Sequence, residues 1–188
     1  MNAAAVIDFW FGAPPLATRR EWFVKDPAFD ETIRVCFGAL VDRALAGPLG
    51  WGGDALSSLA EVIVLDQFPR NLFRGQARAF AGDARARSLA LALVDDGGDL
   101  ALHPLQRWFA YLPLEHAEDL ALQDRSVALF EALAAAEPGE GFASALDYAR
   151  RHRDLIRRFG RFPHRNAALG RASTANEADF LKQPGSGF

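Results

Sequence analysis

The residues of this sequence best suited to chemistry are arginines, histidines and carboxylates, which gather in a few short stretches. Arginine binds carboxylate or phosphate groups through paired hydrogen bonds, and a histidine beside a carboxylate can act as an acid or base near neutral pH. We predict that His116 or His164 is the acid–base group and that Glu115 or Asp66 orients it. These residue types favour a pocket for an anionic small molecule, a phosphate or a carboxylate.

Two stretches supply most of the candidate ligand-binding groups. Both place Phe-Pro near the end of a predicted helix, at 68–69 and 162–163, and Arg-Asn soon after it. The two asparagines are equally suited to capping a helix or forming a turn. The expected ligand-binding residues are Arg70, Asn71, Arg74, Arg107, Tyr111, Gln123, His152, Arg153, Arg161, Arg165, Asn166, Arg171 and Ser173.

Some of these polar side chains interrupt the apolar faces of predicted helices. Asp66, Gln123, His152 and Arg153 stand where the helical period expects apolar residues. Buried polar groups need partners, so Asp66 is expected to pair with Arg153 or with His152. Such groups either form a polar network that locks the helices together or line a pocket.

Other chemistries find less support in the residue pattern. A metal site from His116, Glu118, His152 and His164 is an alternative, but these residues are dispersed. A Ser173 nucleophile with His164 lacks the glycine-flanked elbow of serine hydrolases. Neither nucleotide-binding glycine motif is present, and the glycines at 50–53 read as a loop. We expect no bound metal and no cofactor.

The elements that must position these groups are all predicted to be helices, because helical periodicity dominates and no alternating strand pattern stands out. Proline, glycine and capping residues mark the helix ends. Cys36 lies on an apolar face and is predicted to be buried. The expected helices are 4–11; about 30–45, capped by Asp30; one capped by Asp54 and ended by Pro69; 83–94; one from His103-Pro104 ending before Pro113; 118–136; 142–159 with Gly160 behind it; and a short one after Thr174.

Three motifs in this order resemble the signatures of the bacterial domain-of-unknown-function 924 family. They are LDQFPRNLFRG at 65–75, RWFAYLPLEHAEDLALQ at 107–123, and HRDLIRRFGRFPHRNAALGRASTANEADFL at 152–181. Ala117 departs from the motif, which usually has serine there. The resemblance implies an all-helical superhelix similar to tetratricopeptide-repeat proteins and locates the site in these motifs, but it implies no particular reaction.

Composition limits the class of protein. The 188 residues are 50% hydrophobic with one cysteine, which predicts a single all-α domain over 1–183, a tail at 184–188, and a reducing, cytoplasmic location. No apolar run is long enough for a membrane span, and the first twelve residues do not resemble a signal peptide.

The net charge of −3 divides unevenly along the chain. Residues 95–149 carry 11 acidic and 2 basic side chains, whereas 150–171 carry eight arginines and one aspartate. A nucleic-acid partner would bind at residues 150–171, but the net charge of the chain and the expected core positions of Phe159 and Phe162 argue against it. The alternative to a small-molecule pocket is a repeat-type module that binds an acidic peptide in a helical groove. The oligomeric state is left open.

Overall fold

The computed structural model describes residues 1–187, and this part of the chain is all-helical and contains no strand. The predicted fold class is therefore confirmed. Short 3₁₀ turns, among them η3 (Ala77–Phe80) and η5 (Pro163–Arg165), link some of the helices. The α-helices are α1 (Ala3–Phe11), α2 (Pro27–Ala46), α3 (Ala55–Val62), α4 (Phe68–Leu72), α5 (Asp83–Asp95), α6 (Pro104–Glu115), α7 (Leu120–Ala136), α8 (Glu140–Phe159) and α9 (Ala175–Leu181).

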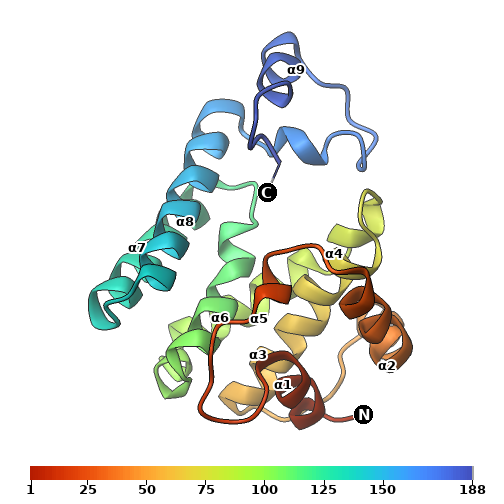
Figure 1. Ribbon diagram of the computed structural model, residues 1–188, viewed down its shortest axis with the longest axis vertical. Coiled ribbons are helices and arrows are strands. Elements are labelled where there is room, and N and C mark those ends of the chain that lie inside the picture. The colour runs from red at the N-terminus through yellow and green to blue at the C-terminus, as the bar shows by residue number, and fades with distance from the viewer. Residues whose placement is uncertain (188) are drawn as a thin grey trace.

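The helices pack mostly against their neighbours along the chain. Helix α8 packs on α7, α7 on α6, α6 on α5 and α5 on α3, while α1 covers α3 and α2 covers α4. Helices α1 to α4 gather at one end of the molecule, and α9 lies at the other end with the segment that follows α8 (Figure 1). The tetratricopeptide-like superhelix stays a prediction.

Apolar packing divides into a large core and a small one. The large core joins α1 to α8 and is rich in aromatic rings, with Trp10, Phe68 and Phe109 almost fully buried. The small core contains Leu155, Ile156 and Phe162, with Phe159 and Phe180 packed against it. The segment after α8 therefore rests on its own apolar cluster.

Several helix ends lie where the capping residues predict them. The side chain of Asp54 accepts the Ser57 N–H, and Thr174 forms a capping box with Glu177. Gly160 adopts φ 70° at the end of α8, a left-handed conformation that glycine enters without steric cost.

Three predicted ends were wrong. Helix α2 begins at Pro27 with Asp26 as its cap, because proline suits the first turn, and Asp30 lies inside the helix. Pro69 does not end the preceding helix, because a π-helix intervenes and places this proline in the first turn of α4. Helix α6 continues through Pro113 to Glu115.

Two further observations concern the surface and the chain ends. Cys36 is exposed, contrary to the prediction, because Ile33, Phe37 and Leu40 form the buried face of α2. Among the described residues, each helix is too short or too polar to cross a membrane. The division at residue 183 stays a prediction, and the last residue of the expected tail, 188, lies outside the described residues.

Candidate functional site

Asp66 lies on a π-helix in the middle of the long helical run from α3 to α4. The π-helix η2 (Ile63–Gln67) is buried throughout, and the Asp66 carboxylate has no solvent exposure. Its Oδ1 lies 2.8 Å from Nδ1 of His116 and 3.0 Å from Arg70, and its Oδ2 accepts a hydrogen bond of 2.5 Å from Gln67. Because π-helices are rare and often mark functional sites, this position singles Asp66 out.

The pair Asp66–His116 has the charge state of an aspartate beside a neutral histidine. Burial by itself would raise the pKa of Asp66, but Arg70 and His116 outweigh it and hold this pKa well below its usual range. Burial, together with Arg70, lowers the pKa of His116. Since Nδ1 donates to the carboxylate, Nε2 is the ring nitrogen left for a substrate, and 14% of the side chain is exposed.

Two arginines and a second aspartate extend this pair. Arg70 donates two hydrogen bonds to Asp83, of 2.8 and 3.0 Å. Nη1 of Arg165 lies 3.4 Å from Asp83 and donates to the backbone carbonyl of His116 at 3.0 Å. The two guanidinium groups thus balance the two carboxylates.

Arg165 keeps one edge of its guanidinium unused. The group lies against the rings of Phe80 and Phe162, with Cζ at 4.8 and 4.4 Å from their centroids, and the residue is 6% exposed. Its hydrogen bonds to described residues all use Nη1, and the buried Nε has no partner among them. Arg74 and Arg161 use this same Nε–Nη2 edge to bind carboxylates.

A second histidine–carboxylate contact lies behind the first. Nδ1 of His152 is 3.2 Å from Glu115 and 2.9 Å from the carbonyl oxygen of Tyr148. Burial and the charge of Asp66 raise the pKa of Glu115 to about 8, while burial and His116 lower the pKa of His152 to about 3. At neutral pH this contact therefore joins two mainly uncharged groups and is not an ion pair.

His164 stands at the edge of the same cluster. Its ring lies 5.6 Å from that of Phe162, and burial together with Arg165 lowers its pKa to about 4. We call the whole group the Asp66 cluster: Asp66, Arg70, Asp83, Glu115, His116, His152, His164 and Arg165.

The segment that supplies Arg165 is held by Glu118, Arg171, Asn166 and Ser173, whereas Gln123 supports the end of α6. Glu118 accepts two hydrogen bonds from Arg171, of 2.6 and 2.9 Å, and one from the Phe162 N–H. Arg171 also donates to Asn166, and Asn166 donates to Ser173. Gln123, from α7, donates to two backbone carbonyls at the end of α6. The contacts of Glu118, Arg171 and Asn166 therefore hold this segment in place.

The remaining predicted residues contact other partners. The expected pairs of Asp66 with Arg153 and with His152 were wrong, because His116 and Arg70 hold this carboxylate. The separate contacts are Asn71 and Arg74 with Asp30, Arg107 and Tyr111 with Asp99, Arg153 with Asp124, and Arg161 with Glu177.

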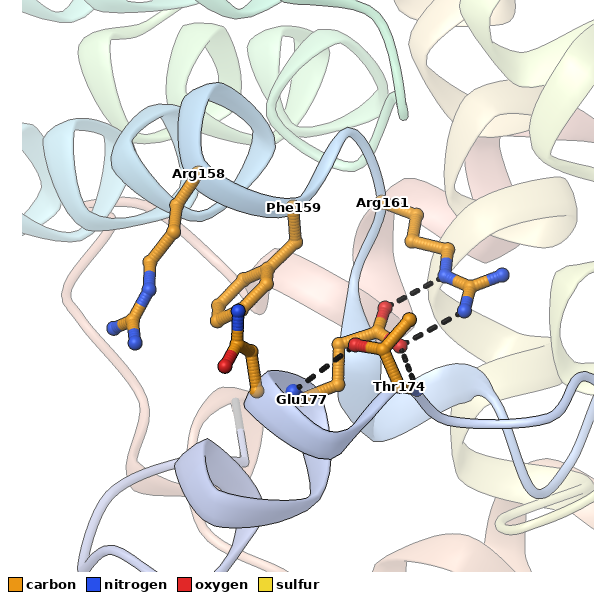
Figure 2. Close-up of a pocket in the computed structure, with 6 residues that line it drawn as sticks. Arg158, Phe159, Arg161, Thr174 and Glu177 are labelled. Atoms are coloured by element: carbon orange, nitrogen blue, oxygen red, sulfur yellow. Dashed lines mark hydrogen bonds and ion pairs between the residues drawn. The ribbon is translucent and has the colours of Figure 1, made fainter.

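A hollow of about 410 Å³ lies elsewhere, between the end of α8 and the start of α9. Figure 2 shows Arg161 and Glu177 bound to each other at its side, while Arg158 extends away from them. The acid and the base at the side of this hollow therefore form an ion pair with each other.

Of the four residues considered as metal ligands, His116, His152 and His164 belong to the Asp66 cluster, whereas Glu118 lies outside it. Glu118 faces Arg171 and the Phe162 N–H, and no group of three or more His, Cys, Asp or Glu in the described part of the chain is arranged to hold a metal ion.

The sequence did not point to Asp83, Phe80 or Phe162 as site residues. Asp83 stands at the predicted start of the helix at 83–94, and a phenylalanine carries no acid, base or charge that would mark it as a site residue. The acidic charge of Asp83 at the start of α5 was a weak indication. It does not reveal that the partners are Arg70 and Arg165, which are 13 and 82 residues away along the chain.

A family model described as a bacterial protein of unknown function (DUF924) matches residues 6–185. The chain belongs to the DUF924 family. A solved structure of a protein of unknown function from Agrobacterium tumefaciens is 40% identical to this DUF924 chain, covers 96% of both chains and superposes with a TM-score of 0.78. No curated protein shows significant similarity to it. The family resemblance read from the three motifs is thereby confirmed.

Proposed function

We propose that this DUF924 protein binds an anionic small molecule at the unused edge of Arg165 and that His116 exchanges a proton with it. The observation that carries the proposal is the buried Nε–H of Arg165, which has no partner among the described residues, on a guanidinium that donates to the His116 carbonyl through Nη1. Leaving a buried donor without a hydrogen bond costs about 1–3 kcal/mol, so such a group needs a reason.

Each member of the Asp66 cluster has a role in this proposal. Asp66 holds the proton of His116 on Nδ1, which leaves Nε2 as the acid–base atom. Asp66 and Glu115 were both predicted to orient the acid–base histidine. Asp66 is the one that lies within hydrogen-bond distance of His116, whereas Glu115 contacts His152. Arg70 and Asp83 keep Asp66 and Arg165 in place.

The binding set proposed from the sequence becomes smaller. Arg165 is the anion-binding residue. His164 lies beside it, and we assign the acid–base role to His116 alone. Asn166, Arg171 and Ser173 position the loop, and the other predicted ligand residues bind groups of the protein itself. The alternative of an acidic-peptide groove stays a prediction.

A thermal-shift screen of carboxylated and phosphorylated small molecules tests the binding step. A ligand that binds the folded protein raises Tm by mass action. Arg165→Lys keeps the charge but removes the two-nitrogen edge, and we expect it to abolish the shift. Arg74→Lys, which alters a similar side-on pair with Asp30 outside the cluster, is the matched control. A hit that stabilises both variants like the parent contradicts the proposal.

Solvent exchange tests the proton transfer. For each hit that has a C–H group between the anionic group and a ketone or aldehyde carbonyl, proton NMR in D₂O follows the loss of that C–H signal. We expect exchange with the parent and with Arg74→Lys, and none with His116→Gln. Exchange that continues unchanged in His116→Gln removes this residue from the acid–base role, while binding measured in the first experiment is unaffected by that result.

A further inference from the structure

We propose that the Arg165 site is selective for a planar carboxylate monoanion over a phosphate. This inference rests on the proposed function and assigns the substrate class of the same site. It is carried by the shape of the free donor edge, by the pairing of the neighbouring cations and by the charge balance of the cluster.

The free edge offers two parallel donors and no more. Nε and Nη2 of an arginine match the two oxygens of a carboxylate, which lie in one plane with them. The rings of Phe80 and Phe162 lie 4.8 and 4.4 Å from Cζ of Arg165 and limit the movement of its guanidinium. A tetrahedral phosphate also has oxygens above and below this plane, where neither Nε nor Nη2 donates a hydrogen bond.

Neighbouring cations are already engaged. Arg70 binds Asp66 and Asp83, and Arg171 binds Glu118 and Asn166. No second free guanidinium therefore faces Arg165 among the contacts of the cluster. A phosphate dianion usually draws on several donors, whereas a carboxylate needs only the edge that is present.

The charge balance leads to the same conclusion. Arg70 and Arg165 already neutralise Asp66 and Asp83, so any bound anion adds uncompensated negative charge. Protonation of His116 can offset one charge but not two. Because unpaired charge in a buried site is costly, a monoanion is favoured over a dianion.

The test compares four small probes on the full-length protein: acetate, acetamide, methyl phosphate and methanesulfonate. Acetamide has the shape of acetate without its charge, and methanesulfonate has the charge with a tetrahedral head. Binding is followed by ¹⁵N NMR of arginine Nε–H groups, with the Arg165 signal identified as the one absent from Arg165→Lys. The Arg74 signal in the same spectra is the internal control.

We expect acetate to shift the Arg165 signal and the other three probes to bind at least about tenfold more weakly, since each loses charge-assisted hydrogen bonds. Tighter binding of methyl phosphate or methanesulfonate at Arg165 overturns the carboxylate selectivity and leaves the proposed anion site intact. Equal binding of acetamide also overturns it. If none of the probes moves the Arg165 signal, or acetate binding persists in Arg165→Lys, both proposals fail.

Discussion

Asp66 shows how one buried carboxylate organises the chemistry around it. It keeps His116 in a single tautomer and holds Arg70 against Asp83. A buried ion pair is not by itself a large source of stability, but removing one partner leaves the other charge buried and unpaired. Replacement of Asp66 should therefore cost much more than replacement of a surface carboxylate.

We predict that Asp66→Asn lowers the free energy of unfolding by about 3–5 kcal/mol, the range observed when one member of a buried pair is removed. Asp42→Asn is the matched control, because Asp42 pairs with Arg78 at an exposed site, where about 0–1 kcal/mol is expected. Urea unfolding monitored by circular dichroism measures both. If the two variants lose similar amounts of unfolding free energy, the buried Asp66 pairs contribute no more to stability than an exposed ion pair.

A second prediction concerns the dependence of stability on pH. The pKa of Glu115 is raised to about 8, so above about pH 4.5 the folded protein holds a proton that the unfolded chain has released. This contribution is full below pH 4.5 and is lost as the pH rises toward 8. The lowered pKa values of His152 and His164, about 3 and 4, act in the opposite direction, because they remove stability as the pH falls below about 6.5.

Stability should therefore be greatest near pH 6.5 and decline as the pH rises to 8.5. Glu115→Gln removes the titrating group, keeps a hydrogen-bonding side chain and should flatten this decline. Unfolding free energies of both proteins at pH 6.5, 7.5 and 8.5 provide the comparison. An unchanged decline in Glu115→Gln contradicts the assignment of the raised pKa to this residue.

At the scale of elements, the π-helix η2 decides where Asp66 points. The wider turn shifts the hydrogen-bond register, so the Phe68 N–H donates to the Ile63 carbonyl five residues earlier. Gly82, just before α5, packs against the backbone of Leu65, and an added Cβ would overlap the Leu65 carbonyl oxygen. This glycine allows α5 to approach the turn that carries Asp66.

We predict that Gly82→Ala destabilises the protein by about 1–3 kcal/mol, because backbone atoms cannot yield as a flexible side chain does. The His116 ring signal in NMR should shift as well, since Asp66 is next to Leu65. Gly38→Ala in α2 is the control, since nothing lies within 4 Å of its added Cβ. Because alanine favours a helix over glycine by up to about 1 kcal/mol, this variant should be neutral or more stable. A neutral Gly82→Ala would mean that α5 and η2 separate easily.

At the scale of the whole molecule, the site joins two parts with separate cores. Asp66 and His116 belong to elements of the large core, whereas Arg165 comes from the segment after α8, which packs on the small core. That segment is tied to the rest of the chain by Glu118, which binds Arg171 and the Phe162 N–H. Its position, and hence that of Arg165, depends on polar contacts.

We predict that Arg171→Gln speeds amide hydrogen exchange in residues 161–174 about tenfold, as expected for the loss of a charge-assisted pair, and leaves α1 to α5 unchanged. Arg125→Gln, which removes an exposed pair with Asp95, is the control and should change neither region. Hydrogen exchange read by mass spectrometry distinguishes the two regions. A uniform increase over the whole chain would contradict a locally held segment.

The sequence by itself determined the local structure. Caps at Asp54 and Thr174 and the glycine at 160 predicted helix ends, because these signals act on neighbours within a turn. Polar residues on apolar faces also predicted that Asp66 and His152 would be buried, and both are.

Only the tertiary structure decided the partners. Asp66 meets His116 across 50 residues, and Arg165 meets Asp83 across 82. Helical period does not reveal the π-helix either, since residues 59–69 are buried on every side and leave no exposed face to mark the phase. Which side chains face each other depends on how whole helices pack. That packing is set by many core contacts together, and no short motif contains them.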